Sequence, residues 1–162
     1  MIQSFEKQTV MTKDELQAYL LEQIPLAGAM GMEIKEATDT EVVLSLPLEP
    51  NINHRDTAFG GSLCAAGTLA CWTLVHLRLS RLDTDTRLVI HKNRMVYRRP
   101  ICGRFEATCT FADDTAWQQV LAMLERWGKA KLQLTSTITC DGEEAAVFRG
   151  SFVVTTAEYH PD

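Results

Sequence analysis

Residues 58–77 read AFGGSLCAAGTLACWTLVHL and contain no formally charged side chain. The stretch is long enough to cross a membrane, but glycines, threonines and His76 dilute its hydropathy, and the sequence offers no second candidate span. In a chain of mixed composition, a helix that is apolar nearly all round is typical of the buried centre of a fold. We therefore predict a core helix that begins at Phe59 or Gly60 and ends near Ser80, and we expect no membrane partner.

The segments on both sides of the core helix show helix and strand patterns. Thr12 and Glu15 form a capping box, which predicts a helix that ends near Pro25. Asp113-Asp114 is expected to cap a second, amphipathic helix that Gly128 ends. Strand patterns occur in Glu33–Ala37, Val42–Leu48, Leu88–Arg99, Arg104–Phe111, Lys131–Cys140 and Ala145–Thr156.

The order of these elements decides the fold class. The all-apolar helix follows two strands and precedes four more, and Asp141-Gly142 is a strong signal for a hairpin between the last two strands. A doubly wound parallel sheet would need a helix after nearly every strand. The order therefore predicts an α+β architecture in which an antiparallel sheet wraps around the core helix. Because no repeat or linker occurs, we expect residues 1–162 to form a single domain.

Composition excludes several classes of protein. The 162 residues are 46% apolar and 23% charged, which is typical of a soluble globular domain. With 16 basic and 21 acidic residues the net charge is −5, so we expect no nucleic-acid partner. The 5 cysteines are odd in number and lack C-x-x-C spacing, which favours buried free thiols and a cytoplasmic location over a disulfide framework. The sequence shows no zinc-ligand spacing and no signal-peptide pattern, so we expect neither a metal nor secretion.

The polar loop Glu49–Ala58 carries most of the chemistry, and it opens the core helix through Gly60 and Gly61. Glycines leave helix-start amides unscreened by side chains, and the helix dipole adds positive potential there. Such a place suits a developing oxyanion. From the residues alone an alternative stays open, in which the two glycines only allow close packing of the helix and the loop is solvated.

Two side chains of this loop are candidate general bases. His54 has an ordinary pKa of about 6.5 and can accept a proton near neutral pH, or it can be an idle exposed side chain. Asp56 can act as the base, or it can cap the core helix, a role that Asp fills well. Thr57 and Ser62 are expected to hydrogen-bond amides at the helix start.

The pattern N-x-N-H-x-x-T-x-F-G-G-S over residues 51–62 resembles the hotdog-fold thioesterases, in which an Asn precedes a Gly-Gly helix start by the same spacing. It is most similar to the thioesterase domain fused C-terminally to some bacterial GNAT-type acyltransferases. Tyr97–Pro100, Gly103 and Phe148–Phe152 carry the likeness further, over residues 15–157 in all. The resemblance implies a hotdog fold, hydrolysis of an acyl-CoA or acyl-carrier-protein thioester without a cofactor, and a homodimer or dimer of dimers with active sites between subunits.

The resemblance also implies roles for particular residues. Asn53 matches the family residue that orients water or the thioester, and the amides of Gly60 and Gly61 match the oxyanion site. Phe59 stands where the acyl-CoA branch has His, and Thr68 stands where that branch has the helix acid. Because Thr cannot replace a carboxylate as base or nucleophile, the base is expected from the loop, as Asp56 or His54.

The substrate is expected to contact residues of the core helix and of the following strand. Small residues near Leu63, Gly67 and Thr68 are expected to leave room for the acyl chain. Arg98 and Arg99 belong to a basic cluster with Lys92 and Arg94, which suits a phosphate of coenzyme A or phosphopantetheine, or protects a solvated edge strand from aggregation. His91 and Asn93 are expected on the strand face of Met95 and Tyr97, toward the pocket, a subunit interface or plain solvent. The candidate substrate contacts are Phe59, Ser62, Thr68, Asn93, Arg98 and Arg99.

Two other functions stay open at this point. A non-catalytic module that binds acyl thioesters would explain why Thr68 replaces the helix acid. Hydratases and dehydratases of the same superfamily also act on acyl thioesters, but they use a loop His together with a helix acid, which Thr68 does not supply.

Overall fold

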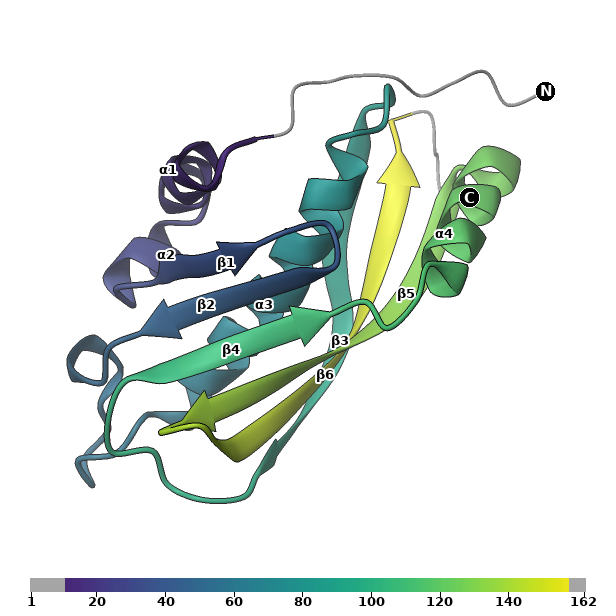
Figure 1. Ribbon diagram of the computed structural model, residues 1–162. Helices are drawn as coiled ribbons and strands as arrows, with labels where there is room; N and C mark the ends of the chain where they lie inside the picture. Colours follow the sequence, from purple (N-terminus) through teal and green to yellow (C-terminus); the bar gives the residue numbers. More distant parts are fainter. Residues whose placement is uncertain (1–10, 158–162) are drawn as a thin grey trace.

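The structure, a computed structural model, describes residues 11–157. A six-stranded sheet with the strand order β1-β2-β4-β5-β6-β3 curves around the long helix α3 (Figure 1). Every neighbouring pair of strands in this sheet is antiparallel. The α+β architecture predicted from the order of the elements is therefore confirmed. The helices and strands are α1 (Lys13–Gln23), α2 (Pro25–Ala29), β1 (Glu33–Ala37), β2 (Glu41–Leu46), α3 (Gly60–Leu79), β3 (Thr86–Tyr97), β4 (Phe105–Thr110), α4 (Thr115–Trp127), β5 (Lys129–Cys140) and β6 (Glu143–Thr156).

The core helix has the bounds that its apolar run predicts. Helix α3 contacts strands β2, β3, β4, β5 and β6, so it lies at the centre of the fold. It is long and apolar enough to cross a membrane by length and composition, yet 67% of that stretch is buried inside the protein. Burial against a sheet explains why the helix is apolar nearly all round.

Strand alternation determines which face of the sheet meets the helix. The buried residues Val42 and Leu44 of β2 lie opposite Cys109 and Ala107 of β4, so both strands direct their apolar sides to the same core. A shift of the register by one residue would turn these side chains to solvent. The hairpin between β5 and β6 turns at Asp141-Gly142, where both residues have positive φ, as a tight hairpin turn requires.

The first helix ends at Gln23, near Pro25 as predicted, and Pro25 begins a second short helix, because proline is well tolerated at the first helical position. Two other local predictions need correction. Asp114 has no side-chain capping bond at α4; its carboxylate pairs with Arg78, and Asp113 accepts the Thr115 amide instead. All five cysteines are free, as predicted, but only Cys71 and Cys109 are buried, whereas Cys64 and Cys140 are half-buried and Cys102 is exposed.

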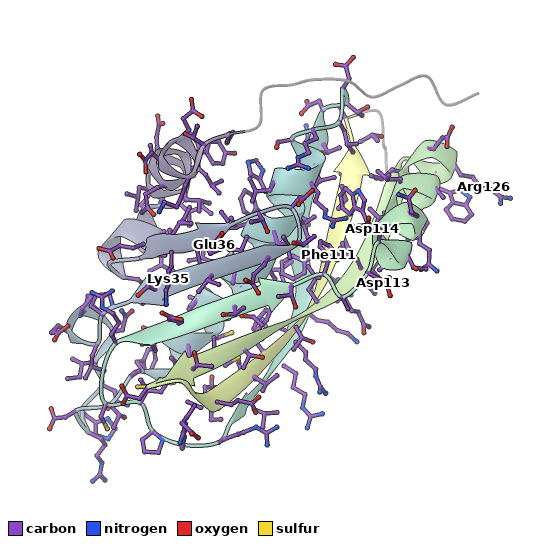
Figure 2. The ribbon with its side chains drawn as sticks, viewed as in Figure 1. Lys35, Glu36, Phe111, Asp113, Asp114 and Arg126 are labelled. Carbon is purple, nitrogen blue, oxygen red and sulfur yellow. The ribbon has the colours of Figure 1, made fainter. Side chains whose placement is uncertain are left out.

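Arg78, near the C-terminus of α3, joins the far end of the helix to two other parts of the fold. It is 7% exposed, and its guanidinium donates to the Asp39 carbonyl and to the Asp114 carboxylate. The guanidinium also lies over the Phe111 ring, at 4.4 Å from the centroid. Figure 2 shows Phe111 and Asp114 where β4 leads into α4.

Candidate functional site

Asn53 organises the loop in front of α3. Its side-chain oxygen accepts the amides of Arg55 and Thr57 at 2.8 and 3.3 Å. Its side-chain nitrogen donates to the Thr57 hydroxyl at 2.9 Å, and the Asn53 amide bonds the Thr57 carbonyl. An Asn side chain that bonds backbone two residues ahead forms an Asx turn, so Asn53 holds the loop in one conformation.

Asn51 ties this loop to the body of the protein, a role that was not predicted from the sequence. Its buried side chain donates to the carbonyls of Met30 and Pro47 at 2.9 and 2.8 Å. Its own carbonyl accepts the amide of Phe59, the residue before α3, at 2.7 Å. Asn51 therefore fixes where the core helix begins.

The capping roles expected within the loop are not found. The N-cap of α3 is Phe59, which makes no side-chain capping bond, so Asp56 does not cap the helix. Asp56 instead takes a left-handed conformation with φ 58° and is exposed. The Thr57 hydroxyl bonds Asn53 rather than a helix-start amide. His54 is also exposed, and its Nε2 accepts from Arg55 Nε at 3.3 Å.

The first turn of α3 presents free amide donors. The first intrahelical bond runs from the Leu63 amide to the Phe59 carbonyl, so the amides of Gly60, Gly61 and Ser62 precede the helical ladder. The Tyr97 hydroxyl, from the end of β3, donates to the Gly60 carbonyl at 3.0 Å. This bond joins the helix start to the sheet and was not predicted from the sequence.

A pocket of about 380 Å³ opens beside this helix start. It brings Gly60 together with both arginines of the predicted site, although they lie far apart in the sequence. The other predicted site residues are not among its lining residues, namely Asn53, His54, Asp56, Phe59, Gly61, Ser62, Thr68 and Asn93. The lining residues are Ala58, Gly60, Leu63, Tyr97, Arg98, Arg99, Pro100 and Ile101.

Gly60 and Gly61 differ in how much space an added side chain would find. A Cβ atom on Gly60 would lie 3.2 Å from the Tyr97 ring, and one on Gly61 would collide with the Phe59 ring. The Phe59 ring therefore folds over Gly61 while remaining exposed. Exposure of a large ring beside free amides makes Phe59 available to a bound molecule.

Thr68 and Asn93 belong to a chain of polar contacts on the strand-facing side of α3. The Thr68 hydroxyl donates to the Cys64 carbonyl at 2.9 Å, and the Cys64 thiol contacts Asn93 Oδ1 at 3.5 Å. Burial raises the pKa of the Cys64 thiol and of the Tyr97 hydroxyl. Both groups therefore keep their protons at neutral pH, so Tyr97 is a hydrogen-bond donor and Cys64 is not a thiolate.

The expectation that Gly67 leaves room for an acyl chain is wrong. A Cβ atom on Gly67 would lie 2.6 Å from Phe148 Cβ and 2.7 Å from Phe148 Cγ. The space beside this glycine is filled by the sheet. Gly67 therefore allows close packing of α3 on β6, and the acyl chain needs another path.

The basic residues of β3 and the turn after it are in part paired. Arg98 Nε lies 2.6 Å from Glu144 Oε1, and Arg99 Nη2 lies 3.4 Å from Glu143 Oε2. His91 is exposed at a bulge between Ile90 and Lys92, which interrupts the alternation on which its predicted face depended.

His76 stacks between the rings of Tyr19 and Trp72, at 4.8 and 4.7 Å between centroids. His76 therefore packs in the core, and its Nε2 has no hydrogen-bond partner within the described chain. Burial lowers the pKa of His76.

A second hollow, of about 700 Å³, lies on the face of β1, β2 and β4 that is turned away from α3. The Lys35 ammonium and the Glu106 carboxylate pair across it at 2.6 Å. Figure 2 shows Lys35 and Glu36 on β1 at this face. None of the predicted site residues lines this hollow.

In residues 11–157, no group of three or more His, Cys, Asp or Glu side chains could hold a metal ion.

The curved antiparallel sheet around one long buried helix, with a helix start at Gly60 that lines a pocket, defines a hotdog-fold protein. Residues 13–156 match the family described as "Putative thioesterase (yiiD_Cterm)", and the chain belongs to this family.

Solved structures agree with this assignment. A protein of unknown function from Chlorobaculum tepidum is 30% identical and superposes with a TM-score of 0.84, covering 90% of this chain and 98% of that one. A "putative thioesterase" from Shewanella oneidensis is also 30% identical, with a TM-score of 0.77 and coverage of 88% and 96%. A thioesterase from Haemophilus influenzae shares the fold at 16% identity, with a TM-score of 0.69 and coverage of 95% and 97%.

Proposed function

We propose that this protein hydrolyses the thioester of an acyl-CoA or an acyl-carrier protein. The observation that supports this most directly is the pocket in which the free amide end of α3, at Gly60, lies beside Arg98 and Arg99. The amides suit the carbonyl oxygen of a thioester, and the guanidiniums suit the phosphates that both carriers bring. Membership of a family described as thioesterases agrees with this reading.

In the proposed reaction, the thioester carbonyl oxygen accepts hydrogen bonds from the Gly60 and Gly61 amides. Water adds to the carbonyl carbon and gives a proton to a base of the loop, and the negative charge that develops on oxygen faces the helix start. The carbon–sulfur bond then breaks, the sulfur takes up a proton, and a carboxylic acid and a thiol leave. Asn53 keeps the loop in position for the water.

We propose Asp56 as the base ahead of His54. Within residues 11–157, the Asp56 carboxylate makes no hydrogen bond or ion pair, whereas His54 Nε2 already accepts from Arg55. The left-handed backbone of Asp56 shows that the loop holds this residue in a conformation that few side chains adopt readily. Asp56→Asn suits the same backbone and is expected to abolish turnover with little change in stability.

Substitutions at Gly60 test the oxyanion site without removing the fold. Gly60 is the first helical residue, where proline is favoured, and Phe59 has the extended backbone that a following proline needs. Gly60→Pro deletes the amide N–H, while the matched control Gly60→Ala adds the same Cβ beside Tyr97 and keeps the N–H.

Release of free thiol from a series of acyl-CoAs of increasing chain length measures the effect. We expect Gly60→Pro to lower kcat by about 100-fold or more and Gly60→Ala to retain most activity. Equal rates for the two variants would contradict the oxyanion role. No release from any acyl-CoA or acyl-carrier substrate would contradict hydrolysis itself.

A binding module without catalysis is the second function that a specific observation favours. Thr68 occupies the position of the helix acid, and its hydroxyl is engaged with the Cys64 carbonyl. Calorimetry that shows tight binding of an acyl-CoA without its consumption would support this module over the hydrolase.

We also propose that the protein is a cytoplasmic homodimer that pairs through β3. This strand is an edge of the sheet and is 12 residues long. It exposes apolar side chains, among them Val89 at 58%. A long exposed apolar edge is a template for another strand, and a second copy there would cover Tyr97 and reach the pocket. Sedimentation that shows a monomer at micromolar concentration would contradict this arrangement.

A further inference from the structure

The arginines of the pocket lie against an acidic hairpin tip. The turn between β5 and β6 and the residues after it carry Asp141, Glu143 and Glu144. Glu144 pairs with Arg98 at 2.6 Å and Glu143 pairs with Arg99 at 3.4 Å. The amides of both arginines also donate to the Ala145 carbonyl, at 2.8 and 3.2 Å. These backbone bonds keep the segment of Arg98 and Arg99 next to the segment of Glu143 and Glu144, independently of the ion pairs between their side chains.

These ion pairs are easily exchanged. The Arg98 side chain is 57% exposed and the Glu143 side chain 73% exposed, and exposed pairs contribute little to stability. A phosphate offers several acceptor oxygens to a guanidinium in the geometry that a carboxylate uses. A phosphate that enters the pocket can therefore replace either carboxylate at small cost.

We infer that Glu143 and Glu144 engage the guanidiniums that form the phosphate subsite of the pocket, and that they set its affinity by competing with the substrate's phosphate for Arg98 and Arg99. The inference rests on the proposed function, because it takes the ligand to be the phosphate-bearing arm of an acyl thioester. Coenzyme A and the phosphopantetheine of a carrier protein share that chemistry.

The test is the double variant Glu143→Gln/Glu144→Gln, titrated calorimetrically with coenzyme A, with 4′-phosphopantetheine and with pantetheine, which has no phosphate. Exposed pairs of this kind are weak individually, so we expect coenzyme A to bind about 3- to 30-fold more tightly to the variant. Pantetheine is expected to bind both proteins equally, and the gain is expected to shrink at high salt. A gain with both phosphate ligands indicates a site for one phosphate, and a gain with coenzyme A alone indicates its further phosphates.

Two variants separate pairing from total charge. Asp141→Asn removes one negative charge from the same hairpin, at a residue that pairs with neither arginine and whose left-handed backbone Asn also adopts. It is expected to leave coenzyme A affinity nearly unchanged. Adding Arg98→Gln and Arg99→Gln to the double variant is expected to abolish the gain. The same gain in Asp141→Asn, the same gain for pantetheine, or no gain in the double variant would each overturn the inference.

A failure of the phosphate subsite can be distinguished from a failure of the proposed hydrolase activity. S-acyl pantetheine carries the thioester without a phosphate, so its hydrolysis tests the reaction alone. Hydrolysis together with an unchanged affinity in the double variant would overturn only the phosphate subsite. A tightened phosphate affinity without any hydrolysis would keep the subsite and overturn the hydrolase.

Discussion

Gly67 is the position where one methyl group should disturb the fold most. It lies in the middle of α3, and the nearest atoms to an added Cβ are Phe148 Cβ at 2.6 Å and Phe148 Cγ at 2.7 Å. Carbon atoms in contact normally lie about 3.5–4.0 Å apart. The Phe148 Cβ cannot turn away, because it is fixed to the backbone of β6. Gly67→Ala therefore requires α3 and β6 to separate by roughly 1 Å.

Two opposing effects determine the size of the change. Ala is a better helix former than Gly by about 1 kcal/mol, which favours the variant. Overpacking in a filled core typically costs about 1–3 kcal/mol and occasionally more. Because the contact involves atoms next to the backbone, we expect the upper part of that range and a net loss of about 2 kcal/mol. In a chain of this length, that corresponds to a fall in Tm of roughly 4–8 °C.

The matched control is Gly28→Ala in α2, where the nearest atom to an added Cβ is Leu21 Cδ2 at 3.7 Å. The same methyl group finds ordinary contact distance there, so helix propensity should leave the stability equal or slightly higher. Urea unfolding followed by circular dichroism gives the midpoint and the m-value of each variant. If Gly67→Ala proves as stable as Gly28→Ala, the close packing of α3 on β6 is refuted.

Three further predictions concern single side chains. Tyr97→Phe removes the bond to the Gly60 carbonyl, so we expect a loss of stability of about 1 kcal/mol and a lower kcat in the thiol-release assay. Burial lowers the pKa of His76 in the folded protein, so the unfolded chain binds the proton first on acidification. Stability is therefore present in full above about pH 6.5 and falls below it, whereas His76→Phe should lose less between pH 7.5 and 5.5 in thermal melts. Arg78→Met leaves the Asp39 carbonyl and the Asp114 carboxylate without their donor, and should cost about 2–3 kcal/mol in urea unfolding.

The fold could be predicted because buried apolar residues recur in the sequence at the spacing of a helix or a strand. The uncharged run around Gly67 can only be a helix that is covered on nearly all sides, and a sheet is the one partner that the remaining segments supply. Residues such as Val42 and Leu44 alternate with the pleat of β2, so their face follows directly from their spacing. Period and turn chemistry act locally, and therefore both can be read from one sequence.

From the sequence, the candidate site could be located in the segment before and at the start of α3, but the contacts of its individual residues could not be predicted. The resemblance and the Gly-Gly helix start point to Gly60, and the pocket brings Gly60 together with Arg98 and Arg99. The Tyr97 contact could not be predicted, because it depends on where the end of β3 lies relative to the start of α3. The charge of the arginines was evident in the sequence, but the pairing of Arg98 with Glu144 follows from the register of β3 and β6.

The two asparagines of the loop show why roles within it escape prediction. Asn51 and Asn53 are the same residue type, two positions apart, and both lie before the helix. Asn51 turns into the body of the protein and bonds carbonyls of residues that precede the loop, whereas Asn53 bonds the loop itself. Local propensity is equal for the two, so only the tertiary position of the loop distinguishes them. The same reason applies to Asp56: its ability to cap a helix is a local property, but the bond from Phe59 to Asn51 sets the helix start three residues later and leaves the carboxylate exposed. The Asp56 carboxylate is therefore left without a structural partner in the described part of the chain, which is what its proposed role as the base requires.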